Sequence, residues 1–145
     1  MKLKNEMSLT FESRSSNEGF ARTAVSAFIS QLDPTIGEIT DIKTAVSEAV
    51  TNCIVHAYKE SVGLIYISVK IFEGAVVVIK IRDKGGIADI EQAMEPLFTT
   101  GGEERAGLGF AVMQSFTDKV KVTSREGKGT TVVLEKRLMS RIKDV

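Results

Sequence analysis

The sequence has a single cysteine, Cys53, among its 145 residues, so no disulfide forms within the chain. Structural disulfides are typical of oxidising compartments, and their absence fits a reducing one such as the cytoplasm. The residues around Cys53 are apolar. A small core residue is therefore the simplest interpretation of this cysteine.

The sequence also lacks an excess of charge of one sign, because 19 lysines and arginines balance 19 aspartates and glutamates. Without a basic excess there is no broad attraction to nucleic acid, so we expect no direct nucleic-acid partner. Residues 1–11 lack the apolar core of a signal peptide, and no apolar run approaches the roughly 20 residues of a membrane helix. We expect a cytoplasmic protein with no membrane partner.

The composition that remains is that of a globular protein, with 43% hydrophobic and 26% charged residues. The chain has no internal repeat and no low-complexity linker. A length of 145 residues is most simply one domain, and we expect it to span residues 1–145.

Hydrophobic periodicity predicts the order of helices and strands. Alternating Met7, Leu9 and Phe11 indicate a strand over 6–13. Ser15 and Glu18 have capping-box spacing, so a helix is expected from there to about residue 31, before Asp33-Pro34. The residues expected on its buried face are Phe20, Ala24, Val25, Phe28 and Leu32. The later predictions are a helix over 36–58, strands over 64–71 and 75–83 with a turn at 73–74, a short helix near 89–94, a loop over 96–106, a helix over 107–116, strands over 119–126 and 130–137, and a frayed tail from 140.

Two hairpins in this order require antiparallel pairing, which excludes a parallel Rossmann-type sheet. We therefore expect an α+β fold: a two-layer α/β sandwich with a mainly antiparallel mixed sheet and helices on one face.

A polar stripe runs along the helix predicted over 36–58. Glu48, Asn52 and His56 recur at every fourth position, so they lie within about 80° of one another on a helical wheel. The apolar face of the helix centres near 150° from Glu48, so the stripe flanks the core. On spacing alone, a solvated edge and a functional site both remain open.

Glycine-containing segments follow at two later points of the chain. Asp83 ends an apolar strand and leads directly into Gly85-Gly86, and Gly107-Leu108-Gly109 is expected to open a helix. Glycines at a helix N-terminus let backbone N–H groups approach phosphate oxygens. The P-loop motif G-x-x-x-x-G-K-[ST] is absent.

Taken in order, E-x-x-x-N on a helix, D-x-G after a strand, G-x-G at a helix start and G-T-T in the last hairpin resemble the Bergerat-type ATP-binding fold of gyrase and histidine kinases (GHKL). The resemblance covers nearly the whole chain. The runs FARTAVSAFISQLDPT, DIKTAVSEAVTNCIVHAY, PLFTT and GLGF are similar to those of the anti-sigma factor serine kinases, in particular the sporulation anti-sigma F factors.

The resemblance implies roles for the polar stripe. Asn52 matches the asparagine that coordinates the Mg²⁺ bridging the nucleotide phosphates, and an amide oxygen suits that ion. Glu48 matches the glutamate that orients or deprotonates the attacking hydroxyl, which is the catalytic role. His56 is expected to support the site and not to be phosphorylated.

The resemblance also implies the nucleotide-binding residues. Asp83 matches the acid that accepts the adenine amino group, and Thr130 matches a threonine near the same base. The other nucleotide-binding residues that it implies are Gly85 and Gly86 in the glycine loop, Thr99, Thr100 and Arg105 in a mobile lid, and Gly107, Leu108 and Gly109 at the phosphates. Arg22 matches an arginine that contacts protein partners. The family's glycine loop reads D-x-G-x-G, whereas the second spacer is missing here, so we expect a shortened loop near the base.

The function implied is that of an anti-sigma factor. Such a protein binds and inhibits a sigma F-like sporulation sigma factor, and uses Mg²⁺ and ATP, with ADP as product, to phosphorylate a serine of an anti-anti-sigma factor. A homodimer is also implied.

Three alternatives stay open at this stage. A non-catalytic module that binds sigma factor in a nucleotide-dependent way would tolerate the altered glycine loop. The equivalent kinase of a stress-response sigma factor would have the same site. A histidine kinase core or a gyrase-like ATPase fits less well, because the single histidine, His56, lies inside the nucleotide motif and we expect no transducer domain.

Overall fold

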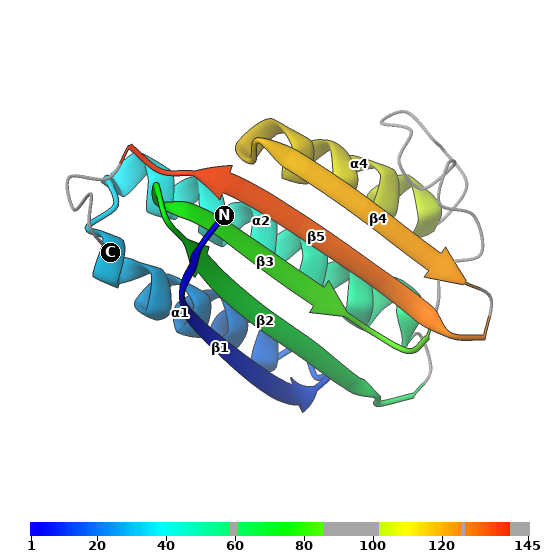
Figure 1. The fold of residues 1–145 in the computed structure, drawn as a ribbon. Helices are drawn as coiled ribbons and strands as arrows, with labels where there is room; N and C mark the ends of the chain where they lie inside the picture. Colours follow the sequence, from blue (N-terminus) through cyan, green and yellow to red (C-terminus); the bar gives the residue numbers. More distant parts are fainter. Residues whose placement is uncertain (59–60, 86–101, 126, 140–145) are drawn as a thin grey trace.

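A five-stranded sheet carries the helices on one of its faces in this computed structural model (Figure 1). The structure describes residues 1–58, 61–85, 102–125 and 127–139, excepting the side chains of 102–108. The described elements, in chain order, are β1 (Leu3–Glu12), α1 (Asn17–Ile29), the 3₁₀-helix η1 (Ser30–Leu32), α2 (Ile36–Asn52), the π-helix η2 (Cys53–Ala57), β2 (Leu64–Phe72), β3 (Val76–Arg82), α4 (Gly102–Phe116), β4 (Lys119–Arg125) and β5 (Gly129–Arg137).

The strand order of the sheet is β1-β2-β3-β5-β4. All four pairings between the described strands are antiparallel. The β2–β3 hairpin turns at the predicted place, where Gly74 has a φ of +80° that glycine adopts without strain. The expected α+β sandwich with helices on one face is confirmed.

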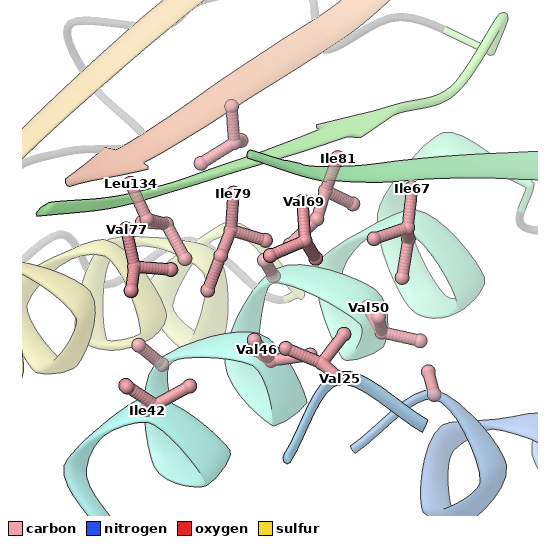
Figure 2. Close-up of a cluster of buried hydrophobic side chains, with 14 of the residues drawn as sticks. Val25, Ile42, Val46, Val50, Ile67, Val69, Val77, Ile79, Ile81 and Leu134 are labelled. Carbon is pink, nitrogen blue, oxygen red and sulfur yellow. The ribbon is translucent and has the colours of Figure 1, made fainter. Parts of the chain in front are cut away.

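The core lies between the sheet and the helix layer (Figure 2). Branched residues such as Ile67, Val69 and Ile79 point from the sheet toward Val46 and Val50 of α2. All of these side chains are at most 3% exposed. Because α2 also contacts α1 on one side and α4 on the other, it is packed closely on several sides, which limits the movement of its polar residues.

The capping box predicted from Ser15 and Glu18 is not the feature that begins α1. The cap residue is Ser16, whose side chain makes no capping hydrogen bond, and the Glu18 carboxylate accepts a hydrogen bond from the Ser47 hydroxyl of α2. The predicted buried face is confirmed at Val25 and Leu32, which are fully buried, but it was wrong at Phe20, which is 53% exposed. The Glu18 side chain, which the local pattern assigned to a cap, thus takes part in a contact between α1 and α2.

A complete capping box opens α2. The Glu38 N–H donates to Thr35 Oγ1 at 3.1 Å, and the Thr35 N–H donates to Glu38 Oε1 at 2.9 Å. Both residues therefore satisfy amide donors that a helix start leaves without partners.

Two other helix boundaries differ from the prediction. The helix expected over 36–58 is α-helical only to Asn52 and continues as the π-helix η2. The helix expected from 107 begins at Gly102, so Gly107 and Gly109 lie inside α4 and do not open it. The predictions for 89–94, for 96–101 and for the tail from 140 fall outside the described residues. No helix in the described part has the length and apolar character that crossing a membrane requires.

Candidate functional site

The polar stripe of α2 faces the backbone of α4. A Cβ atom at Gly109 would lie 3.2 Å from Glu48 Oε2 and 3.2 Å from both Oδ1 and Nδ2 of Asn52. The ends of the two side chains therefore converge on one point, and the missing side chain of Gly109 leaves room for them. Asn52 is therefore buried in a contact between helices, while Glu48 is half-buried at its edge.

Asn52 is a buried polar residue, only 4% exposed. Within the described part of the chain, its Nδ2 atom has no hydrogen-bond partner. A buried amide without a partner costs free energy that a core of apolar residues would avoid, and such groups are uncommon in folded proteins. The amide of Asn52 and the carboxylate of Glu48 offer hard oxygen ligands, which fit Mg²⁺ carried by a phosphate group.

His56 lies in η2, one turn beyond Asn52, and is 9% exposed. A π-helix changes the angle between successive residues, so the wheel position extrapolated for His56 from an α-helix does not apply. The three atoms nearest to a Cβ at Gly109 belong to Glu48 and Asn52.

Asp83 and Thr130 lie together, as the sequence predicted. Asp83 is 3% exposed and Thr130 is 2% exposed. The Asp83 Oδ1 atom accepts hydrogen bonds from the N–H of Gly85 at 3.0 Å and from the N–H of Thr130 at 3.3 Å. The Thr130 hydroxyl donates to the Ser124 hydroxyl at 3.0 Å, which fixes its orientation.

Cys53 is a contact of Asp83 that the sequence interpretation missed. Burial, followed by the charge of Asp83 and a hydrogen bond from the thiol to its carboxylate, raises the pKa of Cys53 well above its usual value. The thiol therefore stays protonated and able to donate. The one available signal was its place directly after Asn52, on the helix that carries the site.

Glycines bring the backbone segments of this region close together. A Cβ atom at Gly85 would lie 2.1 Å from the Ala57 carbonyl oxygen, so only glycine allows this approach to η2. Gly129 has a φ of +91°, and a Cβ atom there would lie 2.0 Å from the Asp83 carbonyl oxygen. The sequence motif G-T-T included Gly129, but it did not indicate this close approach to Asp83.

Several predicted site residues fall outside these observations. Gly86, Thr99 and Thr100 lie outside the described residues. The backbone of Arg105, Gly107 and Leu108 belongs to α4, but nothing is described of their side chains.

A pocket of about 290 Å³ adjoins Glu48 and reaches α1. It is lined by Arg22, Thr40, Lys43, Thr44, Ser47 and Glu48. Arg22 Nη1 lies 3.7 Å from Glu18 Oε1, and the same carboxylate oxygen accepts the Ser47 hydroxyl. The predicted partner residue and the predicted catalytic residue thus share one opening on the surface.

Comparison with known proteins gives this geometry a context. Residues 11–136 match the family model described as a histidine kinase-like ATPase domain. The chain is 56% identical over 137 residues to the anti-sigma F factor of Caldanaerobacter subterraneus subsp. tengcongensis, covering 94% of this chain and 96% of the relative. It is 57% identical over 142 residues to the anti-sigma F factor of Thermoanaerobacter pseudethanolicus, covering 97% and 99%. The chain belongs to the anti-sigma F factor family.

Solved structures support the fold of this anti-sigma F factor family member. The RsbU and RsbW domains of a Mycobacterium tuberculosis protein superimpose with a TM-score of 0.70 at 20% identity, over 93% of this chain and 33% of that one. A blue-light activated histidine kinase from Erythrobacter litoralis gives a TM-score of 0.58 at 19% identity, over 80% and 40%. At these identities the likeness concerns the fold alone.

Proposed function

We propose that the chain binds and inhibits a sigma F-like sporulation sigma factor in the cytoplasm, and that it is a serine kinase for an anti-anti-sigma factor, using Mg²⁺ and ATP. The observation that carries the kinase proposal is the convergence of Glu48 Oε2 and the Asn52 amide at Gly109. Binding alone does not need a carboxylate at that point, whereas phosphoryl transfer from ATP to a hydroxyl group does.

Glu48 is the catalytic residue of this proposal. A serine hydroxyl is a poor nucleophile, and a positioned carboxylate that orients it and takes its proton typically contributes about 10²–10⁴-fold to the rate. Asn52 is the protein ligand of Mg²⁺, which when bound neutralises the charge of the phosphates. The fixed distance of both side chains from α4 supports placement, on which phosphoryl transfer largely depends.

The nucleotide base is proposed to bind at the other end of the site. Asp83 accepts the adenine amino group, with Thr130 beside it, and its hydrogen bonds to Gly85 and Thr130 support a fixed position. Gly107, Leu108 and Gly109 of α4 lie at the phosphates in this proposal. Gly86, Thr99 and Thr100 are assigned from the family resemblance alone, and so is Arg105, which lies in α4 and not in a loop.

The acceptor serine is proposed to enter through the pocket between Arg22 and Glu48. Lys43 and Arg22 provide positive charge at its walls, and Ser47 and Thr44 provide hydroxyl groups. Such a lining suits a polar segment of an anti-anti-sigma protein. The ion pair with Glu18 supports an ordered Arg22 side chain at the edge of the pocket.

A homodimer is part of the same proposal. β1 forms an edge of the described sheet, and its outer backbone groups are available for pairing with a second copy of the chain. Sigma factor would then bind across the two copies.

The test is to mix the chain with Mg²⁺-ATP and an anti-anti-sigma protein, and to search the latter for phosphoserine by mass spectrometry. Transfer of phosphate to serine is the expected result. ATP binding without transfer would contradict the kinase and favour a nucleotide-dependent binding module, which the shortened Asp83–Gly86 loop also fits.

A further inference from the structure

The helix η2 and the residue that follows it, Tyr58, contact three successive residues of the segment 83–85. The Cys53 thiol donates to the Asp83 carboxylate. The Ala57 carbonyl oxygen lies against Gly85, where a Cβ atom would come within 2.1 Å of it. The Tyr58 hydroxyl accepts a hydrogen bond from the Lys84 N–H at 2.7 Å. The helix that carries Glu48 and Asn52 is therefore joined at its end to the loop that carries Asp83.

The Tyr58 hydroxyl bridges two backbone segments. It accepts from the Lys84 N–H and donates to the Leu64 carbonyl oxygen at 2.9 Å, so both of its hydrogen-bonding roles are used. Leu64 begins β2, and Lys84 follows β3. Since the bridge fixes the residue directly after Asp83, it restricts where the Asp83 carboxylate can lie.

The aromatic ring of Tyr58 packs closely against Gly63, which has no side chain. A Cβ atom at Gly63 would lie 2.2 Å from Cε1 of the ring, so glycine provides the space in which the ring rests. The Gly63 N–H donates to Ser13 Oγ at 2.9 Å, and the Ser13 N–H donates to the Gly63 carbonyl oxygen at 2.8 Å. The support of Tyr58 thus extends to the residue after β1.

The π-helix accounts for the reach of Tyr58. Its wider turn carries one more residue than an α-helical turn, and such turns are frequent at functional sites. The Tyr58 N–H donates to the Cys53 carbonyl oxygen at 3.0 Å, five residues earlier. The hydroxyl of Tyr58 and the thiol of Cys53 therefore contact the same short segment from one turn of helix.

We propose that Tyr58 is a positioning residue for the base-binding end of the nucleotide site: by holding the Lys84 N–H, its hydroxyl sets the position of the Asp83 carboxylate and with it the preference for adenine over guanine. The inference rests on the proposed function, in which Asp83 accepts the adenine amino group. It assigns a role in nucleotide selection to a tyrosine that belongs to the helix segment and not to the base-binding loop.

The test compares binding of Mg²⁺-ATP and Mg²⁺-GTP by calorimetry in the full chain and in Tyr58→Phe, which removes the hydroxyl and keeps the ring. We expect the ratio of the two affinities to fall about three- to tenfold, through weaker ATP binding, because one hydrogen bond is lost. GTP affinity should not change, since both nucleotides share the phosphates. In phosphotransfer assays KM for ATP should rise while kcat stays constant.

The matched control is Tyr66→Phe, which removes the hydroxyl of the chain's only other tyrosine. Tyr66 lies in β2 with Lys84 Nζ 5.2 Å from its ring centroid, and that contact needs no hydroxyl. This variant should keep the nucleotide preference of the original chain.

An unchanged ratio in Tyr58→Phe, with ATP preferred by the original chain, would overturn this inference alone. Failure of the original chain to bind ATP would overturn the proposed function as well. If Tyr58→Phe does not fold, amide hydrogen exchange at Lys84 in the original chain decides: slower exchange with saturating ATP supports the inference, and an unchanged rate overturns it.

Discussion

Asp83 and Thr130 are joined by three hydrogen bonds, although 47 residues separate them in the sequence. Their backbones exchange N–H···O bonds of 2.9 and 3.2 Å, and the Thr130 N–H also lies 3.3 Å from Asp83 Oδ1. These bonds extend the pairing of β3 with β5 past the end of β3. The acid proposed to read the base is therefore fixed to the sheet and not carried on an independent loop.

The substitution Asp83→Asn tests whether Asp83 binds the adenine base. Asparagine keeps an oxygen that can accept from Gly85 and Thr130, but it loses the charge that strengthens a hydrogen bond from the adenine amino group. We expect ATP affinity to fall about tenfold or more, since hydrogen bonds to charged groups contribute about 1.5–3 kcal/mol. Calorimetric titration measures this change.

Asp118→Asn is the matched control, because Asp118 Oδ2 likewise accepts a backbone hydrogen bond, from Arg137 at 2.7 Å. It should leave ATP affinity unchanged. Equal losses of affinity in the two variants would mean that Asp83 has no specific role.

Replacing Gly109→Ala tests the contact between α2 and α4. Alanine favours a helix interior by up to about 1 kcal/mol over glycine. Here, however, its Cβ atom would lie 3.2 Å from Glu48 Oε2 and from the Asn52 amide, so these side chains must move. We expect phosphate transfer to fall sharply while the melting temperature changes little.

The control for that substitution is Gly37→Ala in α2, where an added Cβ atom meets only Thr35 Oγ1 at 4.0 Å. Transfer rates should match those of the original chain. A Gly109→Ala variant with full activity would contradict the account of this contact.

Replacing Asn52→Leu separates function from stability. The Nδ2 atom is buried and has no hydrogen-bond partner among the described residues, so an apolar side chain of similar size removes an unfavourable group. We expect the free energy of unfolding to be unchanged or higher, while Mg²⁺-dependent ATP binding is lost. Urea unfolding and calorimetry measure the two quantities, and a destabilised variant that still binds Mg²⁺-ATP would refute both parts.

The capping box of α2 gives a prediction of stability. Thr35→Ala removes the hydroxyl that accepts the Glu38 N–H, and loss of such a cap costs about 1 kcal/mol. Nucleotide affinity should not change, because the box lies at the opposite end of α2 from Asn52. Urea unfolding at pH 7 measures the difference.

The same capping box makes the free energy of unfolding depend on pH. Burial works against ionisation of Glu38, but hydrogen bonds from the Thr35 and Met139 N–H groups and from the Thr35 hydroxyl, with the charge of Lys136, lower its pKa below the usual 4.5. A carboxylate with a lowered pKa stabilises the fold above the pKa of the unfolded chain, and this contribution is lost as the pH falls through the folded-state pKa. Glu38→Gln should therefore be less stable than the original chain at pH 7, and the gap should close as the pH falls through the lowered folded-state pKa of Glu38. A gap that persists below that pKa would exclude the charge as its source.

The sequence was sufficient for the architecture because hairpin turns and alternating strands are local signals. It failed where contacts between elements decide the outcome. Glu18 was assigned to a local cap, but Ser47 of α2 binds it instead. The spacing of Glu48, Asn52 and His56 fits one continuous α-helix, so nothing in it indicated that a π-helix begins at Cys53.

The candidate site was predicted to a similar extent. Glu48 and Asn52 were expected to face one point because they are one helical turn apart, whereas Asp83 was expected near Thr130 only through the family resemblance, since β3 and β5 are not neighbours in the sequence. The contacts of Cys53 and Gly129 with Asp83 were missed, since each joins segments that are distant in the sequence. Such contacts are visible only once the chain is folded.

The most direct measurement of the central claim is the rate of phosphate transfer to the anti-anti-sigma protein by Glu48→Gln, with ATP affinity measured in parallel. Glu73→Gln, in the exposed turn between β2 and β3, is the control and should retain full activity. The account predicts that Glu48→Gln binds ATP normally but transfers phosphate about 10²–10⁴-fold more slowly. Transfer by Glu48→Gln at close to the original rate would contradict it.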